Sequence, residues 1–209
     1  KRIRDLRPAD LDCYVGAMRE DGIATSTIHH RVVVLSQLIK AAVRAGSIAA
    51  PPCVITRPRV IQKSERTCTP EPQFEKLLAA ATKAADKRLL ALLLLAADAG
   101  LRRAEIGRLL GRDVRLDLDG DDDGTFGTLH IAVRDETDRT KSGRGRNVPI
   151  LTHRLAKALA ALFADPDKPI LRMAPDGDGV RKLADELWKL AKLGPGSRIH
   201  ELRHRWVTK

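Results

Sequence analysis

The residues best suited to chemistry are arginines and histidines in short motifs that lie far apart in the chain. Arg102 stands two residues after Gly100, shortly after a run of nine apolar residues, 89–97. Near the end of the chain, His200 and Arg203 stand three residues apart, so on a helix they would share a face. A guanidinium stays charged and donates hydrogen bonds through a planar fork, which suits a phosphate. These motifs predict a site that binds a phosphate group.

The same C-terminal motif also satisfies a second pattern. His200, Glu201 and His204 form H-E-x-x-H, the motif of zinc proteases, in which both histidines bind zinc and the glutamate acts as general base. However, residues 194–196 (Gly-Pro-Gly) break the chain just upstream, and no third ligand is evident in the five residues that follow. A zinc-dependent hydrolase is therefore an alternative interpretation.

The acidic stretch 117–127 (DLDGDDDGTFG) is similar to a calcium loop but lacks the glutamate that ends an EF-hand loop. We expect an acidic turn there and neither a metal nor a cofactor in the protein.

The charge balance points to a polyanionic partner. The formal net charge is +11, with 12 Lys and Arg against 6 Asp and Glu up to Arg66, and 26 against 21 after it. The excess is therefore spread along the chain, as expected for a protein that binds DNA or RNA, although a basic enzyme would look similar. The three cysteines form no C-x-x-C pair, the longest apolar run is too short to span a membrane, and no signal peptide is visible. We expect a cytoplasmic protein without a membrane role.

The elements that must position these residues fall into two parts. Residues 1–50 read as a small helical domain, and residues 51–68 as a basic, proline-rich linker. Residues 69–209 read as a mixed α/β domain with helices near 70–81, 89–97, 103–110, 152–163 and 178–192. Between the third and fourth helices, "TLHIAV" and "RNVPI" read as strands joined by a hairpin connection. We predict a mostly α fold with a small antiparallel sheet.

Four segments together resemble one known family. "AGLRRAEIGRLLGRDV" resembles the first arginine box of tyrosine recombinases, or phage integrases, and "TKSGRGRNVPI" resembles their β-hairpin. "IHELRHRWVT" resembles their second box, and "AVRAGSIAAPP" resembles the end of their core-binding domain. The segments follow the family's order and extend over nearly the whole chain.

The resemblance implies a role for four residues. Arg102 and Arg203 would stabilise the charge that develops on the non-bridging phosphate oxygens. Lys141 would be the general acid that protonates the departing 5′-oxygen, and His200 would exchange a proton with the nucleophile. We expect Glu105 to brace the helix of the first arginine.

Neighbouring residues receive less specific expectations. We expect His204 to pack or hydrogen-bond locally, and Arg103 to be a surface residue. In the family, an attacking tyrosine lies beyond the second box, but the only tyrosine here, Tyr14, matches no catalytic position, and we expect it to pack.

The resemblance thus implies a bacterial or phage-encoded, nucleoid-associated site-specific recombinase or integrase whose nucleophile lies beyond Lys209. Residues 1–50 would be its core-binding domain, and residues 69–209 its catalytic domain, truncated at the C-terminus. It would form a 3′-phosphotyrosine intermediate and act on double-stranded DNA as a homotetramer on paired sites, while the chain alone would be inactive for cleavage and could be monomeric. The chief alternative is a non-catalytic DNA-binding protein of the same fold.

Overall fold

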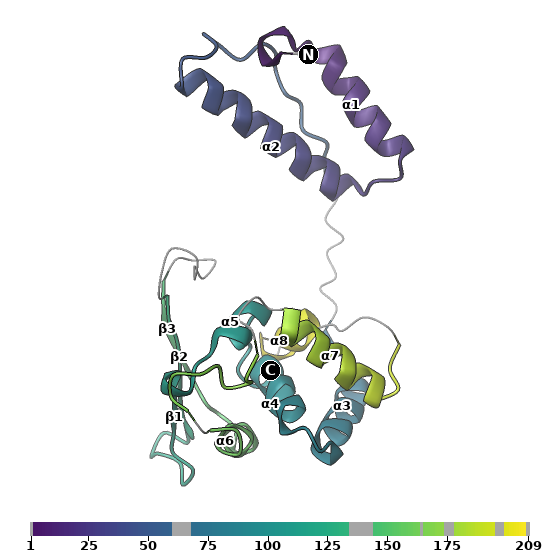
Figure 1. Cartoon of the computed structure of the whole chain (residues 1–209). Coiled ribbons are helices and arrows are strands. Elements are labelled where there is room, and N and C mark those ends of the chain that lie inside the picture. Colours follow the sequence, from purple (N-terminus) through teal and green to yellow (C-terminus); the bar gives the residue numbers. More distant parts are fainter. Residues whose placement is uncertain are drawn as a thin grey trace. The chain divides into compact units, whose positions relative to one another are not determined.

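The computed structural model describes residues 2–59, 68–133, 144–163, 165–173, 178–194 and 199–207. The chain divides into two compact units, Lys1–Ser64 and Glu65–Lys209. Helices predominate, and one small antiparallel sheet is present (Figure 1), which confirms the predicted fold class. No described helix is long and apolar enough to cross a membrane.

The first unit is a pair of helices with a short core of its own. Its elements are η1 Ile3–Asp5, α1 Pro8–Glu20 and α2 Thr25–Arg44. Met18 of α1 packs against Ile28 and Val32 of α2, and Ile55 packs on the same cluster. His29 Nδ1 lies 3.0 Å from the Pro58 carbonyl oxygen. Thus part of the segment that the sequence assigns to a linker contacts α2.

The second unit holds the remaining elements. They are α3 Glu71–Lys83, α4 Lys87–Ala97, α5 Arg103–Arg108, η2 Gly111–Asp113, β1 Val114–Leu116, β2 Gly127–Ile131, β3 Arg146–Pro149, α6 His153–Ala160, α7 Asp178–Leu190 and α8 Ile199–Val207. Each predicted helix and strand is present within a few residues of its predicted limits, whereas β1 was not predicted.

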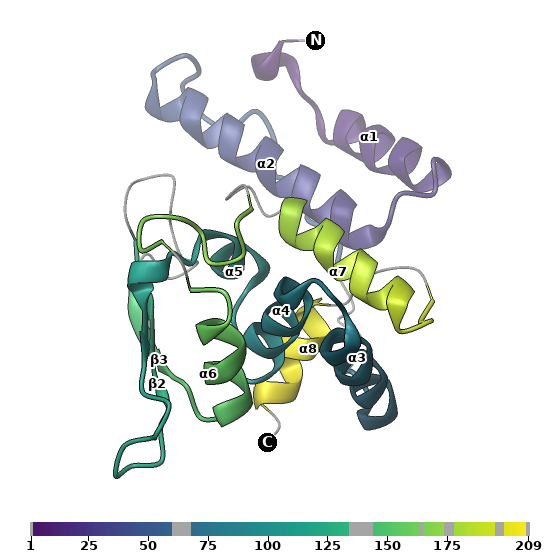
Figure 2. The same ribbon diagram turned by 60° about the horizontal axis from the view of Figure 1, so that its bottom comes forward.

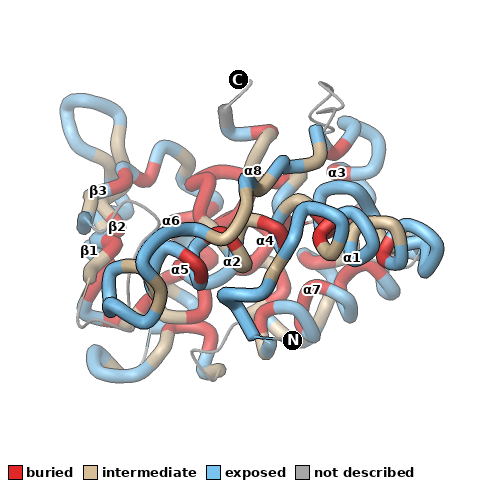
Figure 3. Tube along the Cα trace, turned by 90° about the horizontal axis from the view of Figure 1, so that it is seen from above, coloured by how far each residue is buried: buried red, intermediate tan, exposed pale blue. Residues whose placement is uncertain are grey.

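Helix α4 is the centre of the second unit. It contacts α3, α5, α6, α7 and α8, and α6 lies between α4 and the sheet (Figure 2). From Leu89 to Ala97 all residues but one are buried, which the tube in Figure 3 shows in red. A helix that other elements cover on most sides needs apolar residues on most of its faces, and the run of nine apolar residues provides them. This buried helix carries the chain to the loop that precedes Arg102.

The sheet is a three-stranded meander in the order β1-β2-β3. Leu129 of β2 pairs with Val114 on one side and Val148 on the other, and all three face the core. On the opposite face, His130 Nδ1 lies 2.7 Å from Asn147 Oδ1. The register fixes which side chains of β3 point toward the helices, because side chains alternate along a strand.

Candidate functional site

The first site element is the turn between α4 and α5. Gly100 has φ +61°, a left-handed conformation that favours glycine. Arg102 is the residue just before α5, and its backbone N–H donates to Glu105 Oε2 at 2.8 Å. A carboxylate that reaches back to the start of its own helix satisfies a donor that would otherwise lack a partner. The expected bracing by Glu105 is confirmed.

The second site element is α8, which is held on the helical core by several contacts. Ile199 and Leu202 are buried in that core. Arg205 donates two hydrogen bonds to Glu71 of α3, one of them from Nη2 to Oε1 at 2.6 Å. Its guanidinium also lies 4.1 Å above the centre of the Phe74 ring. These contacts fix the helix that carries Arg203.

The turn at Gly100 and the end of α8 touch directly. A Cβ atom at Gly100 would lie 3.0 Å from Cδ2 and Cε3 of Trp206. The backbone just before Arg102 therefore packs against the helical turn just after Arg203.

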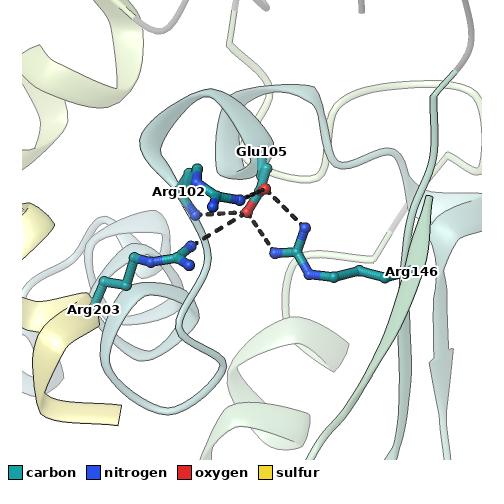
Figure 4. A network of polar contacts seen from close by, with 4 residues as sticks. All are labelled: Arg102, Glu105, Arg146 and Arg203. Atoms are coloured by element: carbon teal, nitrogen blue, oxygen red, sulfur yellow. Dashed lines mark hydrogen bonds and ion pairs between the residues drawn. The ribbon is translucent and has the colours of Figure 1, made fainter. Parts of the chain in front are cut away.

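Three arginines from different elements converge on one carboxylate (Figure 4). Arg102 Nη1 donates to Glu105 Oε1 at 2.8 Å. Arg146 of β3 donates from Nη1 to Oε1 at 2.9 Å and from Nη2 to Oε2 at 2.8 Å. Arg203 Nη1 lies 3.8 Å from Glu105 Oε2. Three positive groups surround one negative group, so the cluster retains an excess charge of about +2.

The electrostatics of the cluster follow from burial and pairing. The Glu105 side chain is only 7% exposed. Burial alone would raise its pKa, but hydrogen bonds from Arg146 and from Arg102 outweigh that effect and lower the pKa to about 2. The hydrogen bond to Glu105 raises the pKa of Arg146. For Arg203, burial is the main cause that lowers the pKa, and Arg102 and Arg146 add repulsion.

Arg203 Nη1 is the unsatisfied group of the cluster. It is buried, and it has no hydrogen-bond partner among the residues that the structure describes. A buried donor without an acceptor costs free energy, and a charged donor costs more. The arrangement therefore favours an anion that brings an acceptor oxygen to Arg203.

The structure brings two of the four predicted site residues together. Arg102 and Arg203 meet at Glu105. His200 is exposed in the first turn of α8, and its ring lies edge-on to His204 with centroids 4.6 Å apart. Lys141 lies outside the described residues, so its predicted role stays a prediction.

Three further expectations concern residues outside this pair. His204 packs locally, as expected, and Arg103 is exposed, as expected. Tyr14 is 43% exposed on α1, so the expectation that it packs was wrong. Among the described residues, no three His, Cys, Asp or Glu side chains are grouped to hold a metal ion.

Sequence reasoning missed Arg146. The segment that contains it was interpreted through Lys141 and the strand, and the arginine two residues before Val148 received no role. The available signal was the alternation of the strand. Val148 is buried, so Arg146 two residues earlier lies on the same face of β3, toward the helices.

Comparison with solved structures places this fold among recombinases and integrases. The chain is similar to lambda integrase, solved as a dimer bound to a COC′ core site, with a TM-score of 0.66 and 16% identity, over 98% of this chain and 73% of that one. It is similar to the Tn1549 transposon integrase in complex with transposon right end DNA, with a TM-score of 0.68 and 16% identity, over 100% and 73%. It is also similar to XerA recombinase, with a TM-score of 0.50 and 20% identity, over 100% and 70%.

Sequence comparison finds no match for the chain. No protein-family model matches the chain, and no curated protein matches it. At identities of 16–20%, the structural likeness establishes the fold, which is that of the recombinases and integrases above.

Proposed function

We propose that this chain is the core-binding and catalytic part of a site-specific DNA recombinase or integrase of the tyrosine type. The observation that carries the proposal is the convergence of Arg102 and Arg203, which lie far apart in the sequence of the second unit, on one buried carboxylate. The fold and the net charge of +11 support it.

The proposed substrate is double-stranded DNA, since two of the similar structures hold DNA. The helical unit would bind the duplex through its basic residues, and the second unit would hold one phosphodiester. We further propose a homotetramer on two paired sites, in the cytoplasm of a bacterium and at its nucleoid.

In the proposed reaction, Arg102 and Arg203 bind the non-bridging oxygens of the scissile phosphate. Fixed donors that are oriented before the reaction stabilise the charge that develops there. A tyrosine outside the printed residues attacks the phosphorus, so an O–P bond forms and the P–O5′ bond breaks. Lys141 gives a proton to the departing 5′-oxygen, and His200 accepts the proton of the tyrosine. Rejoining reverses these transfers.

Cleavage of the protein's own attachment site by full-length protein tests this proposal. Arg102→Ala and Arg203→Ala should each lower the rate of covalent complex formation by about 10²–10³, because each removes a donor to the developing charge. Arg103→Ala is the matched control, since Arg103 is an exposed arginine beside Arg102. We expect near-normal cleavage from the control.

Two outcomes would favour the alternatives. Binding of duplex DNA without cleavage in the unsubstituted protein would indicate a non-catalytic DNA-binding protein of the same fold. Stoichiometric zinc that disappears in His204→Ala would indicate the zinc hydrolase.

A further inference from the structure

The acceptor capacity of Glu105 is fully used by two of the three arginines. Oε1 accepts from Arg102 Nη1 and Arg146 Nη1. Oε2 accepts from the Arg102 backbone N–H and Arg146 Nη2. A carboxylate offers about four lone-pair sites, two on each oxygen. Four donors therefore saturate it.

The full occupancy of both Glu105 oxygens explains why Arg203 Nη1 has no hydrogen-bond partner among the described residues. This nitrogen lies 3.8 Å from Oε2, close enough for Coulomb attraction but beyond hydrogen-bond range. Because Arg102 and Arg146 already fill both oxygens, this buried donor has no site to bind. It is consequently left for an acceptor from outside the protein.

Arg146 supplies two of the four donors that occupy the Glu105 oxygens. Both of its terminal nitrogens donate to Glu105, in the bidentate geometry that gives the strongest pairing of an arginine with a carboxylate. This pair uses two of the five N–H donors of the Arg146 guanidinium, so a direct contact of Arg146 with a phosphate is the alternative that the experiments below test.

We propose that Arg146 is a positioning residue that fills Glu105, so that Arg203 keeps its buried donor for a phosphodiester oxygen. Without Arg146, two acceptor sites of Glu105 open, and Arg203 moves onto them. The role of Arg203 toward DNA rests on the function proposed above, whereas the competition between Arg146 and Arg203 for Glu105 does not.

The first experiment measures binding of dimethyl phosphate, a phosphodiester monoanion, to the 209-residue chain by NMR titration. We expect Arg146→Met to raise the Kd by about tenfold, equivalent to about 1.4 kcal/mol. Arg115→Met on β1 is the control, because it removes one exposed positive charge from the same sheet. We expect this control to change the Kd by less than about twofold, since screened surface charges interact weakly.

Two further variants separate the proposed role from a direct one. In a Glu105→Gln background, adding Arg146→Met should leave the Kd nearly unchanged, since a neutral side chain no longer attracts Arg203. A tenfold weakening that persists in this background would overturn the proposal, because Arg146 would then act on the ligand itself. Arg146→Lys keeps the charge but cannot donate in a bidentate way, so we expect an intermediate Kd.

The second experiment needs no ligand and reports on Arg203 alone. Rotation of the Arg203 guanidinium, followed by nitrogen NMR and assigned with Arg203→Lys, should slow in Arg146→Met because Arg203 then pairs with Glu105. Unchanged rotation would refute the competition for Glu105, whatever the ligand result. If rotation slows but dimethyl phosphate binds equally to the parent and to Arg203→Lys, the proposed function fails while the competition stands.

Discussion

At the scale of single residues, Glu105 determines how the arginines are arranged. It is buried, it braces the start of α5, and it accepts hydrogen bonds from the neighbouring Arg102 and from Arg146 of β3. A buried carboxylate is tolerated because charged donors surround it. The hydrogen bonds that stabilise Glu105 also hold Arg102 and Arg146 close to the guanidinium of Arg203.

The low pKa of Glu105 predicts a decrease in stability in acid. In the unfolded chain the carboxyl titrates near 4.5, whereas in the folded chain its pKa is about 2. The unfolded state therefore binds a proton first, and stability falls as the pH is lowered from about 4.5 to about 2. We expect a contribution of at most about 3 kcal/mol. Urea unfolding at a series of pH values, compared with Glu105→Gln, measures it. Parallel curves for the two proteins would contradict the prediction.

The resemblance of the sequence to tyrosine recombinases singled out Arg102, Arg203 and the brace at Glu105, and the structure brings these three residues together. Arg146 was not predicted, because the alternation of β3 indicates only the face on which it lies, whereas its pairing with Glu105 spans forty-one residues. The sequence also could not predict that Arg203 Nη1 lacks a hydrogen-bond partner, because this depends on how many donors reach Glu105.

At the scale of elements, α8 is the part whose position the site depends on most. Its hydrophobic residues join the core, while Arg205 ties it to Glu71 and lies over Phe74. Arg154 of α6 lies 5.6 Å from the centre of the same ring and pairs with Asp98 at the end of α4. Polar contacts around Phe74 thus connect α3, α4, α6 and α8.

Replacement of Arg205 by methionine should loosen α8. Arg205 is 8% exposed, and the substitution removes both its hydrogen bonds to a carboxylate and its cation–π interaction with Phe74. We expect the free energy of unfolding to fall by about 2 kcal/mol. Arg181→Met on α7 is the control, because Arg181 is half exposed and lies 3.6 Å from Asp178, so its removal should cost less than about 0.5 kcal/mol. Equal costs in urea unfolding would refute a special role for Arg205.

The pattern of apolar residues predicted the longer elements of this unit because each of them buries one face or most of its surface. Strand β1 was not predicted, because three residues are too few to show an alternation of apolar and polar side chains. Its existence depends on the pairing of Val114 with Leu129, which the sequence does not display locally.

At the scale of the whole molecule, two units have separate cores. The described core residues of the second unit form one cluster, and Met18, Ile28 and Val32 form another in the first. Sequence composition indicated a division of the chain, but it did not predict that Ile55 and Pro58 contact the first unit. Those contacts depend on tertiary packing rather than on the prolines that made the segment look like a linker.

Removal of residues 1–64 should therefore leave the second unit folded while it weakens DNA binding. We expect the midpoint of thermal unfolding of this unit to shift by only a few degrees, because its core is complete without the first unit. The slope of log K against log salt for random duplex DNA should become shallower by about 0.9 for each phosphate that residues 1–64 neutralise in the whole chain. Calorimetry and fluorescence anisotropy measure the two effects. An unfolded truncated protein, or an unchanged slope, would contradict this description.

The contact between Gly100 and Trp206 has a consequence for the separation of Arg102 and Arg203. Because the glycine has no Cβ atom, the indole of Trp206 can pack against the main chain of the turn. The turn that leads to Arg102 therefore lies close to the helical turn that follows Arg203. Any other amino acid at position 100 would place a carbon 3.0 Å from that ring, so the indole or the turn would have to shift by a few tenths of an ångström.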